Sequence, residues 1–119
     1  MRLVIAAFAA TLLCGCASQR IYNWGGYDDA LYASYKDPAK TEDLRAKLQA
    51  HIEAMETSKQ KVAPGLYAEL GTLYLQSGAK PTAVALYRKE RDAWPESAHL
   101  MNSLISRLER DGIPRGEKN

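Results

Sequence analysis

The stretch from Pro64 to Ser97 decides the fold expected for this chain, and it reads PGLYAELGTLYLQSGAKPTAVALYRKERDAWPES. Within it, Tyr67, Leu70 and Tyr74 recur at helical spacing, which predicts one apolar stripe along a first helix. Gly78 follows this stripe and suits the left-handed conformation that commonly ends a helix. The stretch therefore begins with a helix that stops near Gly78.

A second helix is expected directly after that stop. Pro81 suits its first turn, where the missing N–H is not needed, and Pro95 cannot continue it. Two antiparallel helices pack closely where small side chains lie at their crossing. Gly71 on the first helix and Ala83 on the second have this character, so we expect the two helices to cross there.

This hairpin resembles a tetratricopeptide repeat, a helix–turn–helix unit of 34 residues. The matching residues are Leu70-Gly71-x-x-Tyr74, Gly78, Ala83, Tyr87 and Pro95. Tyr67 replaces the usual Trp, and Glu90 stands where a small residue is expected, which puts the packing at that end of the hairpin in doubt. An ordinary helical hairpin is the alternative. Because a solenoid usually needs about three repeats, neighbouring helices or a partner must complete the core.

The first 15 residues have the build of a secretory signal peptide. Arg2 gives a short positive start, and Leu3–Leu13 is a mostly apolar run. That run is far shorter than the roughly 20 residues that a membrane-spanning helix needs. Residues 1–15 are therefore expected to be removed rather than folded.

The run Leu13-Cys14-Gly15-Cys16 resembles a bacterial lipobox. The resemblance implies that Cys16 is acylated and becomes the new N-terminus, whereas Cys14 follows the bulky Leu13 and does not fit. Ala17 is not the Asp that retains lipoproteins in the inner membrane, so the resemblance implies the periplasmic side of the outer membrane in a Gram-negative host. A plain signal peptide or a short membrane anchor is the alternative.

The rest of the chain predicts an all-α domain of short antiparallel hairpins, stacked as a small tetratricopeptide-like solenoid with a closing helix. Residues 16–26 are expected to be the lipidated Cys and a tether, 27–111 the helical domain, and 112–119 a flexible tail. The helices flanking the central hairpin are expected over 27–36, from Thr41 to about 58, and over 97–110. Their expected apolar faces are Tyr27, Leu31 and Tyr35; Leu44, Leu48, Ile52 and Met55; and Leu100, Leu104 and Leu108 with Met101 and Ile105 beside them. Thr41 is the expected N-cap of the second of these helices.

Composition argues for one packed domain without catalytic chemistry. The chain has 119 residues, 46% of them hydrophobic, and a formal charge of +2, which is too weak to argue for nucleic acid. Neither His51 nor His99 has a metal-ligand motif around it. Asp28 and Asp29 suit a helix start, because adjacent helix residues do not face each other. We therefore expect no metal, no cofactor and no enzyme activity.

The aromatic start of the domain offers candidate contact residues. Tyr22, Trp24, Tyr27, Tyr32 and Tyr35 are too many for one helical face to bury. We expect Trp24 or Tyr32 to remain exposed and to contact a partner lipoprotein or the lipid headgroups. The alternative for Trp24 is that it folds back into the core.

The run Tyr22-Asn23-Trp24-Gly25-Gly26-Tyr27, continued by Leu31-Tyr32-x-x-Tyr35, makes the chain similar to the small bacterial lipoproteins grouped as domain of unknown function 4810. Members of that family are typically encoded beside a lipoprotein resembling the curli-secretion channel and a second small lipoprotein. The resemblance implies an outer-membrane-anchored helical module that binds other envelope lipoproteins or a secretion channel. The alternative is a structural accessory that stabilises a curli-channel-like complex without recognising other clients.

Overall fold

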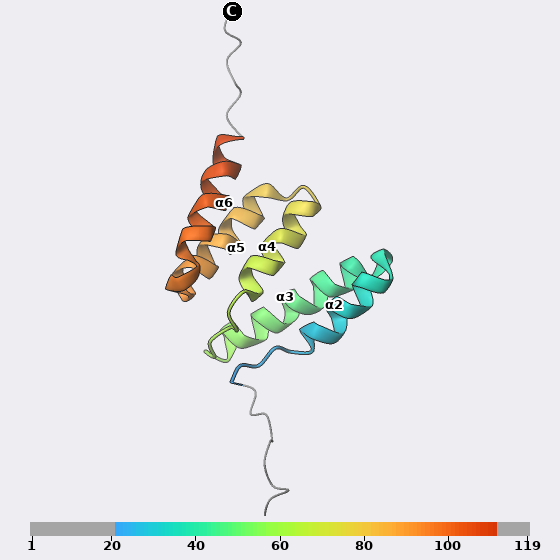
Figure 1. Ribbon diagram of the computed structural model, residues 1–119. Helices are drawn as coiled ribbons and strands as arrows, with labels where there is room; N and C mark the ends of the chain where they lie inside the picture. Colours follow the sequence, from blue (N-terminus) through green and yellow to red (C-terminus); the bar gives the residue numbers. More distant parts are fainter. Residues whose placement is uncertain (1–20, 112–119) are drawn as a thin grey trace, which may run out of the picture.

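The computed structural model describes residues 21–111, and all regular structure in this range is helical (Figure 1). The α-helices are α2 (Tyr27–Lys36), α3 (Thr41–Thr57), α4 (Leu66–Gln76), α5 (Lys80–Ala93) and α6 (Ala98–Arg110). Two short 3₁₀ helices, η2 (Pro38–Lys40) and η3 (Pro95–Ser97), lead into α3 and α6. The all-α class is therefore confirmed. None of the helices within residues 21–111 is long and apolar enough to cross a membrane.

The expected signal peptide over 1–15, the lipidation site Cys16 and the expected tail over 112–119 lie outside the described residues. The described chain begins at one end of the domain, at Ile21, and leaves it at the opposite end, after α6 (Figure 1). The loop between α3 and α4 and the turn before α6 lie at the same end as Ile21 (Figure 1).

The central hairpin has the turn that its sequence predicts. Gly78 has a φ of 84° between α4 and α5, and Pro81 lies in the first turn of α5. The helices approach closely at Gly71, where a Cβ atom would lie 2.9 Å from Tyr87 Cε1 and 3.2 Å from the carbonyl oxygen of Ala83. Ala83 is itself fully buried. A larger side chain at position 71 would therefore push α4 and α5 apart.

Each α-helix packs mainly on its neighbours in the chain, and two connected apolar clusters result. The first cluster lies between α2, α3 and α4, and its α3 members, Leu44, Leu48, Ile52 and Met55, are buried as expected. The second lies between α5 and α6 and includes Val84, Tyr87, Met101 and Ile105. Tyr74 of α4 packs against both clusters, so the two form one continuous interior.

Two of the expected apolar faces are wrong in detail. On α2 the buried residue is Ala30, whereas Leu31 and Tyr35 are exposed, because the helix face that carries Tyr27 and Ala30 is the one packed against the first apolar cluster. On α6 Met101 and Ile105 are buried, whereas Leu100 is 58% exposed. Leu100 precedes Met101 by one residue, which turns its side chain roughly 100° away from the face that packs on α5.

The start of α3 also differs from the prediction. Thr41 is the first residue of the helix rather than its N-cap, and no side chain caps that position. The cap lies earlier, where the Asp37 carboxylate accepts a hydrogen bond of 3.1 Å from the backbone nitrogen of Ala39. Because Pro38 starts a 3₁₀ turn that runs into α3, the capping residue precedes that turn.

Glu90 does not disrupt the packing at its end of the hairpin, although its sequence position suggests that it would. Its side chain is buried, and Oε1 accepts a hydrogen bond of 2.7 Å from the backbone nitrogen of Gly65. Gly65 precedes α4 and has no side chain with which to cap it. Glu90 of α5 therefore supplies an acceptor at the start of α4, where a negative charge is favoured. Burial raises the pKa of this carboxyl, while the backbone amides of Gly65, Ala68 and Tyr67 oppose that rise.

Candidate contact surfaces

The segment from Ile21 to Gly26, which the sequence predicts to be part of a tether, packs on the folded domain. Tyr22 and Trp24 are half-buried and pack against the first apolar cluster. The glycine pair forms a turn, with φ of 59° at Gly25 and 73° at Gly26. The domain therefore begins several residues earlier than the start of α2.

His51 of α3 holds this segment in place. Its Nε2 atom lies 2.9 Å from the carbonyl oxygen of Asn23, within hydrogen-bond distance. A Cβ atom on Gly25 would lie 2.3 Å from Nδ1 of the same ring, so the close approach of the backbone requires glycine there. The Asn23 side chain adds two contacts: Oδ1 accepts from the Gly25 nitrogen at 3.0 Å, and Nδ2 lies 3.8 Å from the Met55 sulfur. These contacts fix the backbone on both sides of Trp24.

Trp94 is a second anchor for the same end of the domain. Its Nε1–H donates to the carbonyl oxygen of Val62 at 3.2 Å. The Tyr22 ring meets it edge-on with centroids 5.4 Å apart, and Lys61 Nζ lies 3.6 Å from its ring centroid. Sequence analysis missed this role, although a large aromatic residue just before Pro95 is the signal that could have suggested it. Trp94, at the end of α5, therefore contacts both the segment that begins at Ile21 and the loop between α3 and α4.

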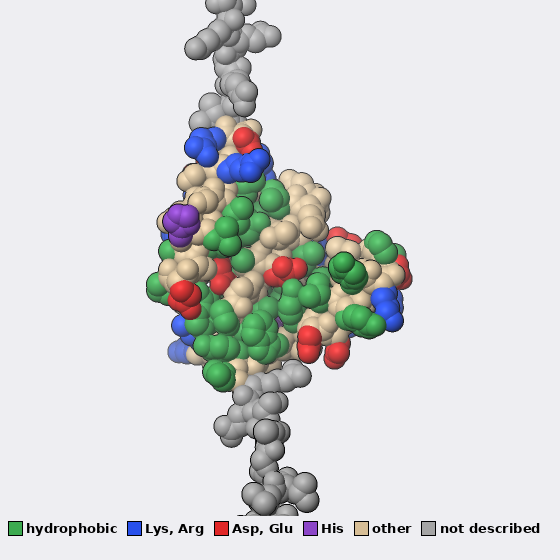
Figure 2. Space-filling view, in the orientation of Figure 1, with side chains coloured by type: hydrophobic (Ala, Val, Ile, Leu, Met, Phe, Trp, Pro, Cys, Tyr) green, Lys and Arg blue, Asp and Glu red, His purple; other side chains and the backbone are tan. Residues whose placement is uncertain are grey.

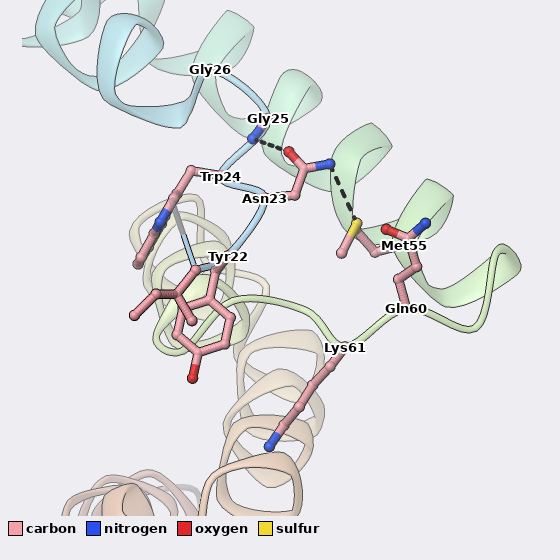
Figure 3. Close-up of a pocket in the computed structure, with 9 residues that line it drawn as sticks. Tyr22, Asn23, Trp24, Gly25, Gly26, Met55, Gln60 and Lys61 are labelled. Carbon is pink, nitrogen blue, oxygen red and sulfur yellow. Dashed lines mark hydrogen bonds between the residues drawn. The ribbon is translucent and has the colours of Figure 1, made fainter. Parts of the chain in front are cut away.

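A hollow of about 730 Å³ opens between residues 21–26 and the end of α3 (Figure 3). Tyr22 and Trp24 lie on one side of it, and Met55, Gln60 and Lys61 lie on the other (Figure 3). We call this the N-terminal hollow, and its described lining residues are Ile21, Tyr22, Asn23, Trp24, Gly25, Gly26, Met55, Gln60 and Lys61. No acidic side chain occurs among them.

A second candidate surface lies on the outer side of α2. Tyr32 and Tyr35 are 63% and 88% exposed, and Leu31 is 37% exposed. These three residues are called the α2 patch below. Lys36 Nζ lies 4.6 Å from the centroid of the Tyr32 ring, a cation–π contact at the edge of the patch. Figure 2 shows hydrophobic side chains on the arm of the molecule that α2 forms.

A groove of about 280 Å³ runs between α3, α4 and α5, but its polar side chains bind one another. Glu56 accepts from Lys89 Nζ at 2.7 Å and from the Tyr67 hydroxyl at 2.8 Å, and Tyr74 donates to Gln49. Lys89, with a smaller contribution from Tyr67, holds the pKa of the Glu56 carboxyl below its usual range. These contacts tie α3 to α4 and α5, which is a structural role.

The residues predicted to matter lie on separate parts of the fold. Trp24 is a half-buried wall of the N-terminal hollow, whereas Tyr32 is exposed on the α2 patch. Gly71 and Ala83 lie at the crossing of α4 and α5, and Cys16 lies outside the described residues. Tyr27 is half-buried beside Glu69, and burial, with that carboxylate, raises its pKa to about 12. Within residues 21–111, no group of three or more His, Cys, Asp or Glu residues is arranged to hold a metal ion.

Comparison with known proteins identifies a family. No curated protein and no solved structure matches the chain. The model of the family described as Domain of unknown function (DUF4810) matches residues 21–104. The match starts at the first described residue, includes the segment that His51 contacts and the whole first apolar cluster, and ends within α6, one residue before Ile105 of the second cluster. Because it spans well over half of the sequence, the chain belongs to the DUF4810 family.

Proposed function

We propose that this chain is a non-enzymatic interaction module, anchored by an acylated Cys16 to the periplasmic side of the outer membrane. In this proposal its helical domain binds another envelope lipoprotein or a secretion channel. The lipobox-like run Leu13-Cys14-Gly15-Cys16 supports the anchor, and Ala17 supports the outer membrane. The short distance in sequence between Cys16 and Ile21 would keep the domain close to the bilayer.

The observation that carries the interaction role is the α2 patch. Tyr32 and Tyr35 are exposed on a helix whose only buried residue is Ala30, so most of the large apolar surface of α2 is left facing outward. Tyrosine is enriched among the residues that contribute most to protein interfaces, because its ring gives contact area and its hydroxyl gives a hydrogen bond. A partner that covers this patch would bury Leu31, Tyr32 and Tyr35 together.

Site-specific photo-crosslinking in the envelope tests the proposal. A photoreactive phenylalanine derivative replaces Tyr32 in the full chain, and the matched control carries it at Ser106, an exposed position on α6. We expect a discrete crosslinked product with one envelope protein from position 32 and none from position 106. Adding Tyr35→Ala should weaken that product. Crosslinking that is equal at both positions, or absent at position 32 in correctly localised protein, contradicts the proposal.

The same strains distinguish the structural-accessory alternative. An accessory that only stabilises a channel complex should leave channel levels dependent on the presence of the chain but insensitive to Tyr32→Ala with Tyr35→Ala. If the chain binds its partner through the α2 patch, that double variant should no longer form the complex. Because both side chains are exposed, the double variant should keep its melting temperature, which separates a lost contact from a lost fold.

A further inference from the structure

We propose that the N-terminal hollow binds the headgroup region of an anionic phospholipid in the same membrane that holds the Cys16 anchor. The inference rests on the acylation of Cys16 in the proposed function, and it adds a second, non-covalent membrane contact made by the folded domain. It assigns the α2 patch to the protein partner and the N-terminal hollow to the lipid, so the two surfaces have separate occupants.

The length of chain before the domain favours this occupant. Four residues separate Cys16 from Ile21. At the reach of an extended chain, about 3.3–3.6 Å per residue, Ile21 can lie no more than roughly 18 Å from an acylated Cys16. Ile21 is itself a lining residue of the hollow, so the hollow is held near the lipid headgroups whichever way the domain is turned.

The side chains at the rim suit a membrane interface. Ile21 is 86% exposed, although it is a large apolar residue. Tyr22 and Trp24 line the hollow beside it, and tyrosine and tryptophan are the residues that gather at the headgroup level of membranes. Figure 2 shows hydrophobic side chains gathered at the end of the molecule where the described chain begins. An apolar rim of this kind can enter the headgroup region.

The charge of the hollow complements a phosphate group. Lys61 is the basic residue among the described lining residues, and none of them is acidic. Its ammonium lies 3.6 Å from the centroid of the Trp94 ring, a cation–π contact that positions the charge and leaves the N–H donors that do not face the ring for a phosphate oxygen. Gln60 supplies an amide group to the same hollow, whereas the Asn23 amide contacts Gly25 and Met55. Its volume of about 730 Å³ lies within the range of small-molecule sites.

Tryptophan fluorescence of the full acylated protein tests the inference. The protein is reconstituted into vesicles of phosphatidylglycerol and phosphatidylethanolamine that contain a phospholipid with a nitroxide quencher on its headgroup. Mass spectrometry of the same preparation first establishes the acyl groups on Cys16. The chain has two tryptophans, of which Trp94 is 6% exposed, so Trp24 is the one expected to be quenched. Trp24→Phe measures the residual quenching of Trp94.

We expect strong quenching in the wild type and loss of most of it in Trp24→Phe. Lys61→Gln should lower the ratio of docked to undocked protein roughly fivefold, the usual effect of one basic side chain at an anionic surface. Arg110→Gln is the matched control, because Arg110 is exposed in the last turn of α6, at the opposite end of the domain, and should change nothing. Replacing phosphatidylglycerol with phosphatidylcholine should act like Lys61→Gln.

Each other outcome overturns the inference. Acylated protein whose Trp24 is not quenched shows that the anchor stands and the hollow does not meet the bilayer. Quenching that is unaffected by Lys61→Gln and by loss of phosphatidylglycerol shows that no anionic headgroup is recognised. Absence of acyl groups on Cys16 removes the anchor on which both proposals depend. Melting temperatures of the variants in detergent distinguish a lost lipid contact from a lost fold.

Discussion

The Glu90 carboxylate lies 2.7 Å from the backbone nitrogen of Gly65, so the second helix of the central hairpin caps the first. The other carboxylate oxygen, Oε2, is buried and has no hydrogen-bond partner among the described residues. The capping bond and the cost of burying the charge therefore act in opposite directions. Burial is the larger effect on the pKa of Glu90, which is raised.

A raised pKa at Glu90 predicts a specific pH dependence. The folded chain binds this proton more tightly than the unfolded chain, so its contribution to the free energy of unfolding is fully present below the ordinary carboxyl pKa and is lost as the pH rises through the raised value. Glu90→Gln removes this titration. The melting temperature of the wild type relative to Glu90→Gln should therefore increase as the pH falls from 8 toward about 4.5. Glu53→Gln, at an exposed position of α3, is the control.

Glu90→Ala should destabilise the domain at every pH. It leaves the Gly65 N–H without its acceptor and opens space beside buried residues. The expected cost is about 1–3 kcal/mol, measured by denaturant unfolding. If Glu90→Ala unfolds at the wild-type denaturant concentration, Glu90 is not the cap of α4.

Gly71→Leu should overpack the crossing of α4 and α5. Even a Cβ atom there would lie 2.9 Å from the Tyr87 ring and 3.2 Å from a backbone oxygen, which cannot move aside freely. We expect a loss of about 1–3 kcal/mol in the free energy of unfolding. Ala85→Leu on the exposed side of α5 should cost much less. Equal unfolding curves for the two variants would show that α4 and α5 are not in close contact at Gly71.

Gly25→Ala should clash with His51 and loosen the packing of residues 21–26 on α3. Its Cβ atom would lie 2.3 Å from the imidazole ring, and the φ of 59° adds backbone strain. Because the clash needs both side chains, Gly25→Ala combined with His51→Ala should be less destabilising than the sum of the single variants. Strict additivity in this double-mutant cycle, measured by thermal unfolding, would argue against contact between the two residues.

The sequence was most informative where a pattern depends on neighbouring residues. Gly78 and Pro81 predicted the turn of the central hairpin, and Leu44, Leu48, Ile52 and Met55 predicted the buried face of α3. These signals are local, since backbone conformation at a glycine and the periodicity of one helix do not depend on distant contacts. The all-α class followed from them.

What the sequence could not provide depends on contacts between distant residues. Glu90 is unfavourable in the interior of a helical hairpin until Gly65, 25 residues earlier, is brought against it. Ala30 packs in the first apolar cluster whereas Leu31 and Tyr35 are exposed, and the periodicity of α2 alone does not reveal which of its faces meets α3. The N-terminal hollow likewise exists only once Tyr22 and Lys61 both meet Trp94.

Acylation of Cys16 is the claim on which both proposals depend, and intact mass measurement of the protein extracted from envelope membranes tests it most directly. We expect a mature chain that begins at Cys16 and carries the mass of a diacylglyceryl group and an amide-linked acyl chain, and we expect Cys16→Ala to leave an unprocessed precursor. A wild-type chain that is cleaved without any acyl mass, or that keeps residues 1–15, would show that Cys16 is not a lipid anchor.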